Sequence, residues 1–158
     1  MSPSRAWIPT SDGCGTGARA AGAESYVAGR AERLPFADRS FDCAVAVTSF
    51  CFIEAQRTAL REMARITRRR VALGLLNRRS ILYLQKGHHG GTGGYRGARW
   101  HSAGEARRLL AGLPLTNVAL MSALFLPGGG ALAQWIENAL PGELPLGAFL
   151  AVAADAGT

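Results

Sequence analysis

Lysine is almost absent from this chain, since Lys86 is the only one among 18 lysine and arginine residues, which stand against 11 acidic residues. The arginines are scattered along the chain and form no basic tail of the kind that binds nucleic acid. The formal net charge is +7, but a surplus of arginine can reflect codon composition alone. The charge by itself therefore does not indicate a nucleic-acid partner.

Cysteine is also scarce, and the chain contains only three: Cys14, Cys43 and Cys51. Their odd number and their spacing exclude a disulfide framework and a cysteine-based zinc site. The neighbours His88 and His89 and the more distant His101 lack zinc-ligand spacing as well, and no cysteine lies near them. We therefore expect no metal, and a reducing compartment.

Long hydrophobic runs are missing too. Apolar stretches such as 118–126 fall well short of the roughly 20 residues that cross a membrane, and the first residues contain no apolar signal segment. We therefore expect a cytoplasmic protein without a membrane partner. With 48% apolar residues, a chain of 158 residues can form one core, so we expect a single domain over residues 1–158. The sequence does not address the oligomeric state.

Apolar patterns in the middle of the chain alternate between strand and helix. The apolar run at 43–47 predicts a parallel strand that is buried on both faces. Apolar residues recur with helical period across 56–67 and predict an amphipathic helix, whose core face is Ala59, Leu60, Met63, Ala64 and Ile66. The arginines at 68–70 predict the C-terminus of this helix, because cations are favoured there. The run at 71–76 predicts the next strand.

Glycine and proline mark the less regular parts of the chain. Residues 1–11 contain two prolines and predict a weakly folded leader that cannot supply a buried central strand. Residues 25–28 predict a short strand that ends at Gly29. The glycine-rich stretch 86–97 fits no regular element and predicts a mobile surface loop.

The last third of the chain begins with a helix signal. Ser102 and Glu105 have the spacing of a capping box, in which each side chain accepts a hydrogen bond from an amide at the helix start, so a helix is predicted to about Ala111. The segments that follow predict a strand, a turn, an amphipathic helix and a last strand, at 118–125, 127–130, 132–140 and 147–153. Strands that alternate with helices predict a mostly parallel sheet.

The segment 12–17 reads Asp-Gly-Cys-Gly-Thr-Gly, with a glycine at every second position. Such a run lets the backbone approach a ligand that side chains would exclude. It has neither the Gly-x-Gly-x-x-Gly spacing of dinucleotide folds nor the Gly-Lys-Ser/Thr of a phosphate loop. In a mostly parallel sheet, ligands bind beyond the carboxyl ends of the strands. The run predicts one part of such a pocket, although short glycine clusters are also common in turns.

Three segments, 12–17, 29–42 and 59–66, together resemble the Rossmann-like (class I) S-adenosylmethionine-dependent methyltransferases, in particular their small-molecule group. The second segment is the most specific of the three, and the resemblance extends over about 25–154. It implies a three-layer α/β fold, with a mostly parallel seven-stranded sheet whose last strand is antiparallel. It also implies S-adenosylmethionine as the cofactor and a small molecule as the methyl acceptor.

The resemblance places the cofactor over the carboxyl ends of the first strands. The backbone of the glycine run would pass under its methionine and ribose, Ala31 and Glu32 would lie beside the adenine, and Thr48, Ser49 and Phe50 would face the sulfonium. The cofactor-binding residues so implied are Gly13, Cys14, Gly15, Gly17, Ala31, Glu32, Thr48 and Ser49.

The N-terminal portion departs from the family pattern. Only residues 18–28 separate the glycine run from the Gly29 motif, whereas a strand, helix and strand unit takes about 30 residues. The acidic residue that the family has a few positions before the first glycine is here Asp12, directly adjacent to it. We therefore expect a truncated N-terminal portion, with a leader and glycine loop at 1–24 and the core at 25–154.

Methyl transfer from a sulfonium is an in-line displacement, for which an enzyme mainly supplies proximity and orientation, sometimes with a general base. His101 is the candidate catalytic base, because imidazole titrates near pH 6.5 and this residue lies close to the helix start at Ser102. A histidine in that position is more often a helix-entry or surface residue. The alternative function is a non-catalytic, methyltransferase-like interaction protein with impaired cofactor binding.

A third, weaker function is that of an RNA-modifying or RNA-binding protein, which is motivated by the positive charge. Aromatic and basic residues also interleave near the glycine-rich loop. Tyr95, Arg96, Arg99 and Trp100 could stack on bases and pair with phosphates. The plainer interpretation is a lid that packs Trp100 onto the domain, and we favour it over a nucleic-acid partner.

Overall fold

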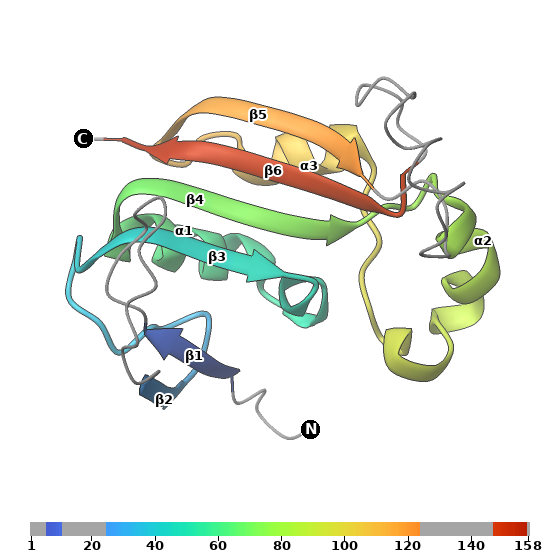
Figure 1. Cartoon of the computed structure of the whole chain (residues 1–158), viewed down its shortest axis with the longest axis horizontal. Coiled ribbons are helices and arrows are strands. Elements are labelled where there is room, and N and C mark those ends of the chain that lie inside the picture. Colours follow the sequence, from blue (N-terminus) through green and yellow to red (C-terminus); the bar gives the residue numbers. More distant parts are fainter. Residues whose placement is uncertain (1–5, 11–24, 124–146, 158) are drawn as a thin grey trace, which may run out of the picture.

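The structure is a computed structural model and describes residues 6–10, 25–123 and 147–157. Its centre is a four-stranded sheet with the order β3–β4–β6–β5 (Figure 1). The bounds of these strands are β3 Phe41–Val47, β4 Thr67–Leu76, β5 Leu115–Ala123 and β6 Phe149–Ala156. β3 and β4 pair in parallel, whereas β6 is antiparallel to both β4 and β5. The predicted α/β fold with an antiparallel last strand is confirmed.

Two helices cover one face of this sheet (Figure 1). They are α1, Gln56–Ile66, and α3, Ala103–Leu110. All five apolar residues predicted for the core face of α1 are buried. The capping box at the start of α3 is formed as predicted, with Ser102 and Glu105 bonded to each other's backbone N–H. Amphipathic period and capping chemistry thus determine both helices.

The hydrophobic core lies between these helices and the sheet. It contains Leu73 and Leu75 of β4 and Leu150 and Val152 of β6, together with the apolar residues of α1 and α3. On the opposite face of the sheet, Val45 is 65% exposed, and a pocket of about 480 Å³ is lined by apolar residues of all four strands. In the described residues no helix packs on this face.

The prediction that the strand at 43–47 is buried on both faces is therefore wrong. Val45 and Val47 are both largely exposed, because no described helix packs on their face of the sheet, and only the other face meets α1. Continuous apolar sequence indicates a strand, but it does not show which faces are covered.

The arginines at 68–70 were predicted to end the helix, and this is also wrong, because they lie within β4. α1 ends at Ile66, and the extended backbone of Thr67 leads straight into the strand. The hydroxyl of Thr67 donates to the carbonyl oxygen of Met63 at 2.6 Å and so satisfies one of the last carbonyls of the helix. Arg68 pairs with Asp42 of β3, and Arg70 pairs with Asp155 of β6.

The first described strands form a separate two-stranded antiparallel sheet, made of β1, Ala6–Thr10, and β2, Ser25–Gly29. The short strand predicted at 25–28 is confirmed. The leader was predicted to be weakly folded, but its residues 6–10 pair with β2 along their whole length. Pro9 is tolerated there because each strand of a two-stranded sheet has one unpaired side.

The glycine-rich stretch also contains more regular structure than predicted. A short helix α2, Ile81–Lys86, precedes it, and two 3₁₀ turns, His88–Gly90 and Gly93–Tyr95, lie within it. Its mobility and the single-domain organisation stay predictions, and the turn and helix predicted at 127–140 lie outside the described residues. Within the described part of the chain, no helix is long and apolar enough to span a membrane.

Candidate functional site

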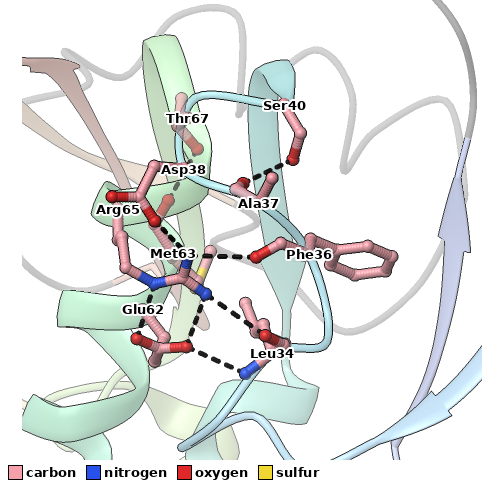
Figure 2. Close-up of polar contacts among 9 residues, drawn as sticks. All are labelled: Leu34, Phe36, Ala37, Asp38, Ser40, Glu62, Met63, Arg65 and Thr67. Atoms are coloured by element: carbon pink, nitrogen blue, oxygen red, sulfur yellow. Dashed lines mark hydrogen bonds and ion pairs between the residues drawn. The ribbon is translucent and has the colours of Figure 1, made fainter.

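Arg65 of α1 fixes the segment that carries the most specific family motif (Figure 2). Its guanidinium donates to the carbonyl oxygens of Leu34 at 3.2 Å and Phe36 at 2.9 Å, and it pairs with the carboxylates of Asp38 and Glu62. Glu62 also accepts a hydrogen bond from the N–H of Leu34 at 2.9 Å. One side chain thus joins the loop after β2 to the helix after β3.

This network shifts the pKa values of both Glu62 and Arg65. The hydrogen bond from Arg65 is the main reason that the pKa of Glu62 lies below its usual value, and burial opposes it only in part. The same contacts raise the pKa of Arg65. Both groups are therefore charged at neutral pH, and they hold the motif as a fixed ion pair.

The motif begins with a tight turn that contains two of the predicted cofactor residues. Ala31 and Glu32 lie between Arg30 and Arg33, which form an isolated antiparallel bridge. Ala31 packs against the core, and the Glu32 carboxylate lies 3.7 Å from the guanidinium of Arg30. The glycine-run residues Gly13, Cys14, Gly15 and Gly17, predicted to lie under the cofactor, fall outside the described residues.

Thr48, at the carboxyl end of β3, has a strained backbone. Its φ is 55° and its ψ is −41°, a conformation that is a genuine outlier for a β-branched residue. Two backbone hydrogen bonds hold it there, one from its N–H to the carbonyl oxygen of Gly74 at 2.8 Å and one from the N–H of Cys51 to its own carbonyl oxygen at 2.9 Å. Strain of this kind costs about 1–3 kcal/mol and is concentrated at functional sites. It turns the chain into the 3₁₀ helix η1, Ser49–Phe52, which contains the predicted residue Ser49.

His101 is pinned to the carboxyl end of β4, beside the end of β3. Its N–H donates to the carbonyl oxygen of Leu76 at 2.8 Å, and its carbonyl oxygen accepts from the N–H of Arg78 at 2.9 Å. The side chain is buried, with 6% of the residue exposed. His101 is therefore not a surface residue, but it does lie at a helix entry, directly before the N-cap Ser102 of α3. Sequence-distant contacts bring it to the same edge of the sheet as Thr48.

Gln56, the first residue of α1, fixes the orientation of this histidine. Its amide nitrogen donates to the carbonyl oxygen of Phe50 at 3.0 Å, so its amide oxygen faces the imidazole, where it lies 3.0 Å from Nε2 of His101. Nε2 must then carry the hydrogen, an assignment that follows from the hydrogen bonds. Sequence reasoning missed Gln56, since no local pattern connects residues 45 positions apart.

Burial lowers the pKa of His101, because the imidazolium is poorly solvated inside the protein, and Glu105 and the Arg99 backbone oppose this shift only in part. The ring is therefore neutral at pH 7, and its Nδ1 carries a lone pair. Nδ1 is buried and has no hydrogen-bond partner in the described part of the chain. A buried unpaired polar atom costs about 1–3 kcal/mol, and such an atom calls for an explanation.

A pocket of about 710 Å³ lies beside this histidine, between the start of α1, the helix α3 and the segment 78–101. Trp100 lines it and packs edge-on against Tyr83, with 5.2 Å between the ring centroids. Trp100 is only 6% exposed, so the interpretation that it packs onto the domain is confirmed. Its Nε1 is the second buried polar atom without a partner in the described residues. No cluster of His, Cys, Asp or Glu in the described residues could hold a metal ion.

The arrangement at this edge is that of a Rossmann-like fold. Parallel strands β3 and β4 end together, and a strained turn and a buried histidine follow their carboxyl ends, where ligands of such sheets bind. Residues 11–73 match the family model described as a methyltransferase domain. This match and the solved structures below show that the chain is similar to the Rossmann-like, class I S-adenosylmethionine-dependent methyltransferases. A search of curated proteins found no match.

Three solved structures illustrate the likeness. An S-adenosylmethionine-dependent methyltransferase from Thermotoga maritima, described as a possible histamine N-methyltransferase, is 26% identical with a TM-score of 0.62, over 81% of this chain and 62% of that one. A Haloferax volcanii complex of the Trm112 methyltransferase activator with a protein described as a putative methyltransferase gives 19% identity and a TM-score of 0.54, over 82% of this chain and 60% of that one.

The third is geranyl diphosphate C-methyltransferase from Streptomyces coelicolor A3(2), bound to Mg²⁺, geranyl diphosphate and S-adenosyl-L-homocysteine. It gives 17% identity and a TM-score of 0.51, over 80% of this chain and 50% of that one. The chain thus spans less than two thirds of each of these proteins.

Proposed function

We propose that this chain acts as an S-adenosylmethionine-dependent methyltransferase on a small-molecule acceptor. The observation that carries the proposal is the pair of unusual features at the ends of two neighbouring parallel strands, the strained Thr48 after β3 and the buried His101 after β4. The match to the methyltransferase family model and the likeness to a solved S-adenosylmethionine-dependent methyltransferase support the reaction type. A structural neighbour that binds geranyl diphosphate supports a small-molecule acceptor.

The residues present fit the implied cofactor, because the strain at Thr48 is stored where a ligand of this fold lies. Ala31, Glu32, Thr48 and Ser49 would hold it, together with Gly13, Cys14, Gly15 and Gly17, which lie outside the described residues. S-adenosylmethionine, when bound, supplies an electrophilic methyl group. The ion pair of Arg65 and Glu62 positions the segment that follows Ala31 and Glu32.

His101 acts as the general base in this proposal. Gln56 holds the hydrogen on Nε2, so the lone pair on Nδ1 is available for the proton of an acceptor hydroxyl or amine. Nδ1 is closed off from solvent in this conformation, so the acceptor reaches it only when the segment 78–101 shifts. Catalytic hydrogen bonds often form only in the complex.

Titration calorimetry of the full chain with S-adenosylmethionine and with S-adenosyl-L-homocysteine tests the proposal. We expect binding with a micromolar Kd, and we expect Glu32→Gln to weaken it about tenfold, the loss of about one charge-assisted hydrogen bond. Glu54→Gln is the matched control, because Glu54 is exposed and lies outside the site. A folded chain that binds neither compound would overturn the proposal and favour the non-catalytic alternative.

A further inference from the structure

The pocket beside His101 carries more positive charge than its own residues neutralise. Among the described residues, the arginines that line it are Arg57, Arg78, Arg99 and Arg108, and the one carboxylate in its lining is that of Glu105. Backbone and side-chain hydrogen bonds from Ser102 are among the causes that lower the pKa of Glu105, so it is ionised at neutral pH. With His101 neutral, the lining keeps a net charge of about +3.

Two of the four arginines are already engaged. Arg57 donates to the carbonyl oxygen of Ala111 at 2.7 Å, at the C-terminal end of α3, and Arg78 lies 3.2 Å from Glu105. Arg99 and Arg108 are exposed, and within the described part of the chain their guanidinium groups form no hydrogen bond or ion pair. Arg99 and Arg108 therefore carry two of the three unbalanced positive charges, and their guanidinium groups are the ones free to bind an anion.

Two residues that line the same pocket, Trp100 and His101, each contain a buried polar atom without a partner in the described part of the chain, and a ligand reaches these atoms only when the segment 78–101 shifts. Nε1 of Trp100 is a donor, and Nδ1 of neutral His101 is an acceptor. An anionic oxygen would satisfy the donor and the two free arginines, and a hydroxyl or amine would satisfy the acceptor. One ligand that carries both an anionic group and a hydroxyl or amine would therefore bind the two free arginines and the two unpaired atoms together.

We propose that this pocket binds a small molecule through a phosphate or carboxylate group held by Arg99 and Arg108. Its volume of about 710 Å³ is in the range of small-molecule sites. RNA is disfavoured, because base stacking needs exposed aromatic faces, and Trp100 is only 6% exposed. That this molecule is also the methyl acceptor rests on the function proposed above; the binding of the anionic group does not.

The test is titration calorimetry of the full chain with pyrophosphate and with citrate, in the absence of S-adenosylmethionine. The two probes separate phosphate from carboxylate recognition. We expect saturable binding of at least one probe, and we expect Arg99→Gln/Arg108→Gln to weaken it at least about tenfold. The control is Arg96→Gln/Arg107→Gln, which removes the same charge from exposed arginines of the same loop and the same helix that do not line the pocket.

Equal weakening by the two double variants would overturn the proposal, because it would show a general charge effect. Absence of binding by both probes would also overturn it, as would displacement of the probe by single-stranded RNA with a much higher affinity. All of these variants change exposed residues, so loss of folding is not the expected cause. Because the probes are titrated without S-adenosylmethionine, the result does not depend on cofactor binding. Failure of the anion site can therefore be distinguished from failure of the proposed methyltransferase function.

Discussion

Arg65→Met should destabilise the fold by about 3 kcal/mol. Its guanidinium serves the carbonyl oxygens of Leu34 and Phe36 and two oxygens of Glu62. We assign about 1 kcal/mol to each of these three partners, because charge-assisted bonds contribute more than neutral ones but this side chain is 30% exposed. The contact with Asp38 adds little, since that carboxylate is 75% exposed.

Thermal unfolding followed by circular dichroism measures this loss. For a domain of this size, about 3 kcal/mol lowers Tm by about 6–12 °C. Arg61→Met is the matched control, since Arg61 lies on the exposed face of the same helix, and it should change stability by no more than about 0.5 kcal/mol. Arg65→Lys should recover little, because an ammonium group cannot reach several acceptors in one plane. Equal Tm values for Arg65→Met and Arg61→Met would refute the reasoning.

The same network predicts a pH dependence. The pKa of Glu62 is lowered in the folded state, so the unfolded chain binds its proton first as the pH falls. The stabilisation is complete above the ordinary carboxyl pKa of about 4.5, and it is lost as the pH falls through the lower folded value. Arg65→Met should flatten this part of the stability curve, because the carboxyl group then loses its main partner.

Three further predictions concern the site and the sheet. The pKa of His101 is lowered by burial, so stability should fall as the pH drops from about 6.5 towards the folded value, and NMR titration of the ring should give a midpoint below 6.5. Thr48→Gly should raise the free energy of unfolding in urea by up to about 1 kcal/mol, because glycine accepts a positive φ. Its control, Thr58→Gly in α1, should lower that free energy by roughly 0.5 kcal/mol. Destabilisation by Thr48→Gly would contradict the inferred strain. Val71→Ala should lower the free energy of unfolding by about 2 kcal/mol and Val45→Ala by less than about 0.5 kcal/mol, since Val71 is 2% exposed and Val45 is 65% exposed. Similar losses for the two variants would show that a partner covers the face of the sheet that carries Val45.

Local signals in the sequence were sufficient for the helices. The apolar period of α1 and the Ser102–Glu105 box of α3 each depend on residues within one or two turns, and both predictions are confirmed. The strand at 71–76 and the last strand were likewise predicted from their apolar runs. Local chemistry therefore identified most of the core elements.

Contacts between distant parts of the chain explain the errors. Arg68 and Arg70 look like a helix terminus, but their carboxylate partners, Asp42 and Asp155, come from neighbouring strands that no local pattern reveals. Val45 is exposed because no helix in the described residues packs on its face of the sheet, which a local pattern does not reveal. The Gln56–His101 contact was missed for the same reason, although His101 itself was selected as the candidate base.

The backbone contacts at His101 have a consequence for how the protein can vary. The bonds from His101 to Leu76 and from Arg78 to His101 bring both ends of the excursion 78–100 together at one point. Because these hydrogen bonds hold both ends of the segment 78–100, a change in its length does not have to move the flanking strand β4 or the flanking helix α3. Each doubling of the length of a loop costs only about 0.6 kcal/mol. Added side chains at Gly93 and Gly94 would meet nothing within 4 Å, although the positive φ of Gly93 disfavours a substitution there. Insertions at Gly94 can therefore lengthen this segment while β4 and α3 stay as they are.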